Sequence, residues 1–269
     1  MFKNLKAYIK DVIDFYDNKD KMPLYIYLGL NLFVIVCAVL EVIRGDLNNF
    51  LLCILTLLLF NIPYFVDRKL KLEMPKLFDI IILLFIFCAE ILGEIQNFYG
   101  IFPDWDTMLH TINGFLAAAI GFSLIDILNT SERFSWQMTP IFVALVSFCF
   151  SMTVGVVWEF FEFGCDNFLN KDMQKDTIVK RINSVTLDKT NSNKPITIDN
   201  INKTIIYYNN NKKEIINNGY LDIGLIDTMN DLLVNFVGAI IFSILGFFYI
   251  KNRDKYQLTE KFIVRKKVT

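Results

Sequence analysis

The chain has 269 residues and a formal net charge of −1 at pH 7, and 54% of its residues are hydrophobic. Its mean hydropathy is +0.41. Soluble domains contain about 45–50% apolar residues, so this composition excludes an ordinary soluble globular protein. The nearly balanced charge gives no reason to expect a nucleic-acid partner.

Residues 1–23 predict an amphipathic amino-terminal helix. Its apolar positions recur at helical spacing opposite several lysines: Phe2, Leu5, Ile9, Val12, Ile13 and Tyr16. Such a helix either lies on the membrane surface or is a short soluble helix leading into the first membrane span, and both alternatives stay open. No cleavage pattern of a signal peptide follows it.

Six apolar runs follow, each close to the roughly 20 residues that a helix needs to cross a bilayer. They cover residues 24–43, 49–66, 77–93, 107–128, 138–163 and 228–250. Backbone groups in lipid must be hydrogen-bonded internally, and runs of this length without alternation are helices. The predicted fold is therefore an all-α polytopic membrane protein with six transmembrane helices, five of them within residues 24–164, and it contacts the lipid bilayer.

Lysine and arginine predict the orientation of these helices. Segments 1–23, 67–76, 129–136 and 251–269 contain 17 of these residues, whereas the short loops 44–48 and 94–106 contain one. Positive residues are enriched on the cytoplasmic side, so both termini are expected there, and residues 251–269 form a basic cytoplasmic tail. The Asn, Lys and Ile bias indicates a bacterial chain, and we expect a multi-pass protein of the plasma (inner) membrane.

The long segment 165–227 is rich in Asn and Lys and is assigned to the extracytoplasmic side by parity. β-branched and aromatic residues flank the turn-forming Asn209, Asn210 and Asn211, which predicts a β-hairpin with strands near 204–208 and 213–217. An earlier strand is expected within 177–187. The alternative is a mostly irregular loop with one local hairpin.

Polar and small residues follow one face in each of the last three predicted spans. In chain order these stripes are Asp106, His110, Gly114, Ala118 and Gly121; then Ser147, Ser151, Gly155, Glu159, Glu162 and Asp166; then Asp227, Asp231, Asn235 and Gly238. Small residues let membrane helices approach closely, so these faces are expected to pack together. The acidic ends would then meet at the outer leaflet, where Glu90 and Glu94 of the third span could join them.

This convergence predicts an outward-facing acidic site. Asp106, His110, Glu159, Glu162, Asp227 and Asp231 are its candidate metal ligands, with Asn235 as a further oxygen donor. Carboxylates gathered in a partly dry site must protonate, admit water or bind a cation. A divalent metal ion is therefore the expected cofactor. A histidine with carboxylates favours zinc or manganese, and oxygen ligands alone suit magnesium or calcium.

Helix capping is the alternative explanation for Asp104, Asp106 and Asp227, because aspartate is favoured at helix amino-termini. Capping does not explain Glu159 and Glu162 near a helix carboxyl end. Trp105 and Trp158 are interpreted as interface anchors.

Three motifs resemble the YjdF-like family of bacterial integral membrane proteins and, more distantly, VanZ-like proteins. They are DTMLHTINGF; VVWEFFEFGCDNFL with NKDMQKDTI after it; and GYLDIGLIDTMNDLLVNFVGA. The similarity covers about residues 75–250. It implies a shared site at the residues named above and names no reaction.

Three functional hypotheses remain open. The first is a metal-dependent enzyme acting on a lipid-linked or envelope substrate, with His110 or Glu159 as the base. The second is a cation transporter. The third is a structural or regulatory membrane protein whose outer loop binds a partner.

Overall fold

The structure is a computed structural model that describes residues 2–129 and 138–267. Its residues form two units: unit 1 is Met1–Gly155 with Leu233–Thr269, and unit 2 is Val156–Leu232. The boundary falls inside two long helices, α8 (Pro140–Leu169) and α9 (Leu225–Lys251). Beyond Asn129, the predicted inner loop 129–136 lies outside the described residues.

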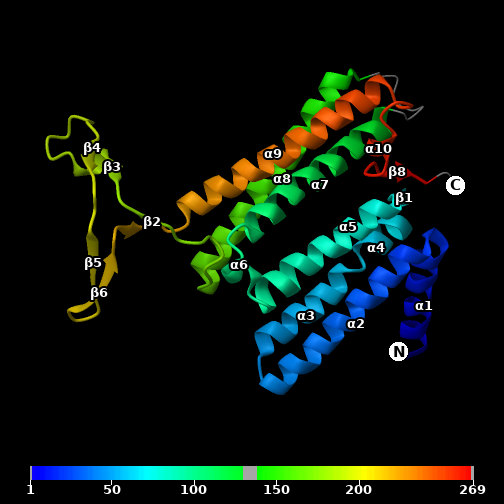
Figure 1. The fold of residues 1–269 in the computed structure, drawn as a ribbon, viewed down its shortest axis with the longest axis horizontal. Helices are drawn as coiled ribbons and strands as arrows, with labels where there is room; N and C mark the ends of the chain where they lie inside the picture. The colour runs from blue at the N-terminus through cyan, green and yellow to red at the C-terminus, as the bar shows by residue number, and fades with distance from the viewer. Residues whose placement is uncertain (1, 130–137, 268–269) are drawn as a thin grey trace. The chain divides into compact units, whose positions relative to one another are not determined.

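Within the described residues, five helices are long and apolar enough to cross a membrane. They are α2 (Lys21–Arg44), the helix Leu47–Leu70, α7 (Trp105–Asn129), α8 and α9. The helix Leu47–Leu70 consists of α3 (Leu47–Leu59) and its continuation α4 (Ile62–Leu70). These helices agree with five of the six predicted spans. Figure 1 shows α2 and α3 running alongside each other in unit 1.

The remaining predicted span, 77–93, is helical but changes its type partway. Residues Lys76–Ile86 form the α-helix α5, and Phe87–Ile95 continue as the π-helix η1, which carries Glu90 and Glu94. Neither part alone has the roughly 20 residues that a helix needs to cross a bilayer. This run is therefore not among the five helices above. A sixth crossing therefore stays a prediction.

Helix α1 (Phe2–Lys19) packs its apolar face against protein. Val12, Phe15 and Tyr16 are buried in a core with residues of α2, α3, α5 and η1. The Tyr16 hydroxyl donates a hydrogen bond to the Phe60 carbonyl at 3.4 Å. Ile9 on the same helix is 49% exposed, so part of the apolar face is left uncovered and both alternatives stay open.

Three acidic residues without a predicted role are ion-paired in unit 1. Lys19 reaches Asp79 at 2.6 Å, Arg44 reaches Glu41 at 2.7 Å, and Arg253 reaches Asp126 at 2.5 Å. All three carboxylates are buried. Because a buried charge is tolerated when it is paired, these acids are explained by structure alone.

The segment predicted to be a basic tail folds back onto unit 1. After α10 (Gln257–Glu260), strand β8 (Arg265–Lys266) pairs antiparallel with β1 (Leu72–Glu73). Ile263 and Val264 are 1% and 6% exposed and belong to the core formed with α7 and α9. The sequence did not predict this docking, for which two apolar residues among the lysines supply a buried anchor.

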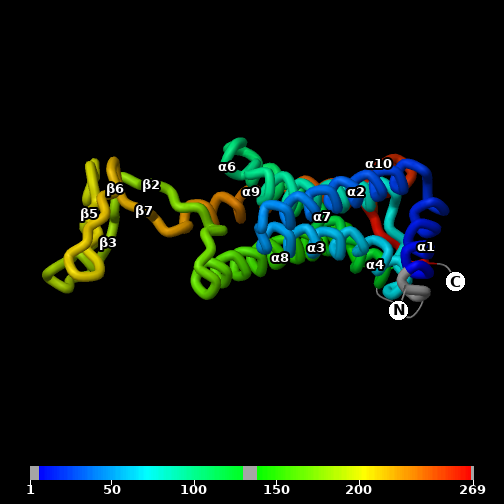
Figure 2. The backbone as a smooth tube through the Cα atoms, turned by 90° about the horizontal axis from the view of Figure 1, so that it is seen from below, coloured from blue at the N-terminus to red at the C-terminus, as the bar shows by residue number. Residues whose placement is uncertain are grey.

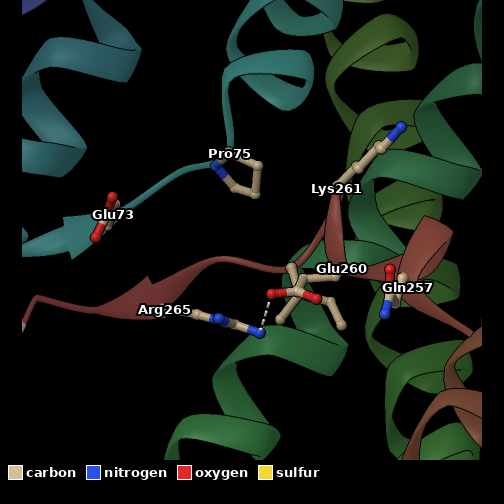
Figure 3. Close-up of a pocket in the computed structure, with 7 residues that line it drawn as sticks. Glu73, Pro75, Gln257, Glu260, Lys261 and Arg265 are labelled. Carbon is tan, nitrogen blue, oxygen red and sulfur yellow. Dashed lines mark ion pairs between the residues drawn. The ribbon is translucent and has the colours of Figure 1, made fainter. Parts of the chain in front are cut away.

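Side chains reinforce this docking. Lys267 forms an ion pair of 2.6 Å with Asp67, which is 2% exposed. The Ser123 hydroxyl accepts a hydrogen bond of 2.9 Å from the Val264 backbone N–H. A hollow of about 440 Å³ lies beside the docked segment, and Figure 3 shows the Glu260–Arg265 ion pair at its edge, 2.7 Å long.

Helices α7, α8 and α9 pack closely within unit 1, as the small-residue stripes predict. Ser147 and Ser151 of α8 donate hydrogen bonds of 2.6 and 2.7 Å to backbone carbonyls of α7. A Cβ added to Gly114 would overlap the Asn235 carbonyl, and one added to Gly238 would overlap the Thr111 carbonyl. Only glycine allows backbones to approach this closely.

Between α8 and α9, unit 2 contains three small antiparallel sheets. They pair β2 (Ile178–Val179) with β7 (Tyr220–Leu221), β3 (Ile182–Ser184) with β4 (Ile196–Ile198), and β5 (Lys203–Tyr208) with β6 (Lys212–Asn217). A 3-10 turn, η2 (Val185–Leu187), follows β3. In Figure 2 these strands lie in the part of the tube whose colour runs from yellow-green at β2 to orange at β7.

The predicted hairpin is confirmed by β5 and β6. Its register pairs Lys203 with Asn217 and Tyr208 with Lys212. Asn209, Asn210 and Asn211 have positive φ angles of 35°, 58° and 69°. Asparagine tolerates this left-handed region better than most residues, so the three asparagines form the turn. The expected earlier strand is present as β2 and β3.

Candidate functional site

Two buried glutamates lie one turn apart on α8 in unit 2. Glu159 is 5% exposed and Glu162 is 7% exposed. The spacing of three places both carboxylates on the same side of the helix. The indole N–H of Trp158 donates a hydrogen bond of 2.8 Å to Glu162 Oε1. Trp158 therefore orients an acidic group, and its interpretation as an interface anchor alone is incomplete.

Asp231 of α9 completes a group of three carboxylates in unit 2. It is 4% exposed, and one ligand atom from each of Glu159, Glu162 and Asp231 lies within 4.8 Å of the other two. Like charges at this separation repel strongly in a partly dry environment. The group therefore favours either proton uptake or a bound cation.

The segment that follows α8 covers this group with a neutral side chain. Gln174 donates from Nε2 to Glu159 Oε2 at 3.3 Å and to the Thr228 hydroxyl at 2.6 Å. The Asp166 carboxylate accepts backbone N–H groups of Met173 and Gln174, at 2.6 and 2.9 Å, which fixes the turn after the helix.

A glycine at the start of α9 makes room for Gln174. Gly224 has a φ of +77°, and a Cβ there would lie 2.6 Å from the Cβ of Gln174. Both the left-handed backbone and the close approach require glycine. The sequence around Gln174 is part of the second motif, but its amide had no predicted role. The signal that could have identified it is a polar residue shortly after the paired glutamates.

Asp227 joins the start of α9 to the segment that follows α8. Its Oδ2 accepts the Lys175 backbone N–H at 2.7 Å, and it lies in the first turn of α9. Among the described groups of three potential ligands, none includes Asp227. The Lys175 N–H belongs to the segment after α8 and not to the first turn of α9, so this hydrogen bond is not a helix cap. The ligand role of Asp227 stays a prediction.

Asp106 and His110 form a pair on α7 in unit 1. His110 Nε2 lies 3.5 Å from Asp106 Oδ1, and the histidine is 7% exposed. The spacing of four residues stacks the two side chains on one helix face, as predicted. A carboxylate beside an imidazole fixes the orientation of the ring.

Asn235 is a packing residue of unit 1. It is fully buried, accepts a hydrogen bond of 3.2 Å from Asn113 Nδ2, and donates one of 3.4 Å to the Ser151 carbonyl. Its amide links α9 to α7 and α8. Buried amides of this kind fix how membrane helices align, which explains the residue without a metal.

Comparison with known proteins agrees with a membrane fold. The chain matches the family described as "Predicted membrane protein (DUF2238)" over residues 25–252. The chain belongs to this family. The match covers α2 from residue 25, the other four long apolar helices in full, and all of unit 2.

The chain is similar to an uncharacterized protein of Thermotoga maritima, with 30% identity over 107 residues. The aligned part is 40% of this chain and 53% of the relative, so the chain spans about half of the relative's length. No solved structure matches the chain significantly.

Proposed function

We propose that this membrane protein binds a divalent cation through Glu159, Glu162 and Asp231. The observation that carries the proposal is the approach of three buried carboxylates from two helices to within 4.8 Å. A divalent cation would offset their mutual repulsion and link α8 to α9. Trp158 and Gln174, which donate hydrogen bonds to two of the carboxylates, support the site by orienting these ligands.

The ligand chemistry indicates which cations to test. Three carboxylates are hard oxygen donors, which suit manganese, magnesium or calcium. Zinc is included because it also binds carboxylate oxygens. A bound cation would polarise a substrate oxygen or activate water, so an enzyme acting on a lipid-linked or envelope substrate is the proposed wider role.

Transport of a cation is the second candidate, because buried acids in membrane helices also mark ion pathways. Packing along α9 favours a fixed site instead. One turn after Asp231, Asn235 is fully buried, and Gly238 lies against the Thr111 carbonyl with no room for a Cβ. Cation flux into proteoliposomes would distinguish transport from fixed binding.

We further propose that the chain crosses a bacterial plasma membrane six times, with α5 and η1 as the third crossing. The lysine and arginine distribution supports both termini on the cytoplasmic side and the strands of unit 2 on the outer side. The YjdF-like resemblance, with its distant VanZ-like similarity, rests on the same motifs and supports a shared acidic site.

Metal content of the detergent-purified protein tests the proposal. We expect stoichiometric cation by mass spectrometry after incubation with manganese, magnesium, calcium or zinc. Glu159→Gln should lose it while retaining the thermal stability of the metal-free protein. Asp172→Asn is the matched control, since the Asp172 side chain is 68% exposed in the same unit. Equal metal in both variants, or none in the wild type, would contradict the proposal.

A further inference from the structure

The strand-bearing segment of unit 2 has the opposite charge to the helix ends that carry it. Residues 177–221 contain seven lysines and arginines against three acidic residues, a net charge of +4. The flanking parts of unit 2, 156–176 and 222–232, contain eight acidic residues and two lysines. Such an asymmetry indicates that the basic segment meets an anionic partner.

One face of the β5–β6 hairpin combines apolar surface with uncompensated positive charge. Alternation along the paired strands places six residues on this face: Lys203, Ile205, Tyr207, Lys213, Ile215 and Asn217. We call it the lysine–tyrosine face. It contains no acidic residue, whereas Glu214 lies on the opposite face and accepts a hydrogen bond from Tyr208.

The apolar side chains of this face are exposed. Tyr207 is 68% exposed, Ile215 is 46% and Ile205 is 38%. A two-stranded hairpin is marginally stable in water unless one face is covered. Exposed isoleucines and a tyrosine next to lysines therefore indicate a surface that a binding partner covers.

We propose that the lysine–tyrosine face docks on the anionic headgroup layer of a lipid bilayer. Lysines attract anionic lipid, and tyrosine and isoleucine insert at the level where headgroups meet acyl chains. A soluble anionic polymer would pair with the lysines but would leave the isoleucines in water. The segment is also joined at both ends to helices long enough to cross the membrane, α8 and α9, which keeps it near a bilayer surface.

Hydrogen exchange on the full chain in nanodiscs tests this inference. We compare nanodiscs of phosphatidylcholine alone with an equal mixture of phosphatidylcholine and phosphatidylglycerol. Amides of residues 203–217 should exchange more slowly in the mixture, and added salt should weaken the protection. Lys203→Gln combined with Lys213→Gln should reduce the protection on the order of tenfold, and Tyr207→Ser should also reduce it.

The matched control removes the same charge elsewhere in the segment, by Lys189→Gln combined with Lys194→Gln. Protection retained in this control supports docking by the lysine–tyrosine face. Equal loss in both double variants would overturn it in favour of general charge attraction. Three further outcomes would overturn it: equal protection in detergent, protection that follows dimer formation, and protection that requires a soluble polyphosphate.

Discussion

At the scale of single residues, the site depends on neutral donors that hold acidic groups in place. Trp158 and Gln174 donate to Glu162 and Glu159 through side chains without charge. Sequence spacing predicted that the two glutamates share one face of α8, because this follows from the helix period. It could not predict the donors, since Gln174 arrives from a turn beyond the helix and its partner is fixed only by the fold.

Trp158→Phe tests the orienting role at this site. The change removes the indole donor to Glu162 and keeps most of the ring. Loss of a group that orients a ligand typically lowers metal affinity by about 10–100-fold. We expect a loss near the lower end, measured by titration calorimetry in detergent.

Trp105→Phe is the control for this experiment, because Trp105 donates to the Cys88 carbonyl in unit 1. It should leave metal affinity unchanged. An equal loss in both variants would indicate a general effect of tryptophan removal.

Asp188 predicts a pH dependence in the strand-bearing segment of unit 2. Thr190, Ser192 and the Lys194 backbone donate hydrogen bonds to its carboxylate. These bonds, first that of the Thr190 hydroxyl, hold the pKa of Asp188 well below its usual range. Because the folded pKa is lowered, the stabilisation is present above the unfolded pKa of about 4 and is lost as pH falls through the folded value.

Hydrogen exchange of residues 188–194, corrected for intrinsic rate, should therefore stay protected from neutral pH to about pH 4. Asp188→Asn should reduce the protection even at neutral pH. Lys189→Gln, at an exposed neighbour, should not. Protection in Asp188→Asn equal to the wild type would contradict the role given to the carboxylate.

At the scale of elements, small residues determine how the helices meet. Gly114 and Gly238 sit where a Cβ would overlap a backbone carbonyl of a neighbouring helix. The stripe pattern predicted these contacts, and asparagines predicted the β5–β6 turn, because both signals are local in sequence. The change from α5 to η1 at Phe87 was not predicted, and we have no physical account of it.

Gly114→Ala and Gly29→Ala should change stability in opposite directions. Gly114→Ala forces α7 away from the Asn235 carbonyl and should cost about 1–3 kcal/mol. Gly29 lies inside α2 with nothing within 4 Å of an added Cβ, so its alanine should stabilise by up to about 1 kcal/mol. Thermal unfolding in detergent measures both, and a stabilised Gly114→Ala would refute the close approach.

At the scale of the whole molecule, the sequence predicted a basic carboxyl-terminal segment but not its docking. Ile263 and Val264 of this segment lie in the core. Two apolar residues in a basic stretch are too short a signal to predict docking. Their partners, Ser123 and β1, are distant in sequence and are brought together only by the complete fold.

Ile263→Ala tests whether this segment stabilises unit 1. Ile263 is 1% exposed, so the truncation should cost about 2–5 kcal/mol. Leu258→Ala is the control, since Leu258 is 63% exposed, and it should be close to neutral. Denaturant unfolding of both variants would decide, and equal midpoints would show that the segment contributes little.

Six crossings predict which residues a membrane-impermeant thiol reagent reaches. Asn97→Cys and Asn210→Cys should react in intact cells, whereas Lys255→Cys should react only after the membrane is opened. The unsubstituted chain corrects for its five native cysteines. Lys71→Cys distinguishes six crossings from five, because α5 with η1 is the only predicted span between Lys71 and Asn97. With six crossings Lys71→Cys stays unlabelled in intact cells, and equal labelling of Lys71→Cys and Asn97→Cys would favour five.

The pairing of β1 with β8 also has a consequence for biosynthesis. Leu72 pairs with Lys266, so almost the whole chain must be synthesised before this strand pair can form. Membrane helices insert in order as they are made, and contacts between such distant residues form late. Asp67 and β1 therefore remain without their final partners, Lys267 and β8, until synthesis is nearly complete. We expect this end of unit 1 to be the last part of the nascent chain to become resistant to protease.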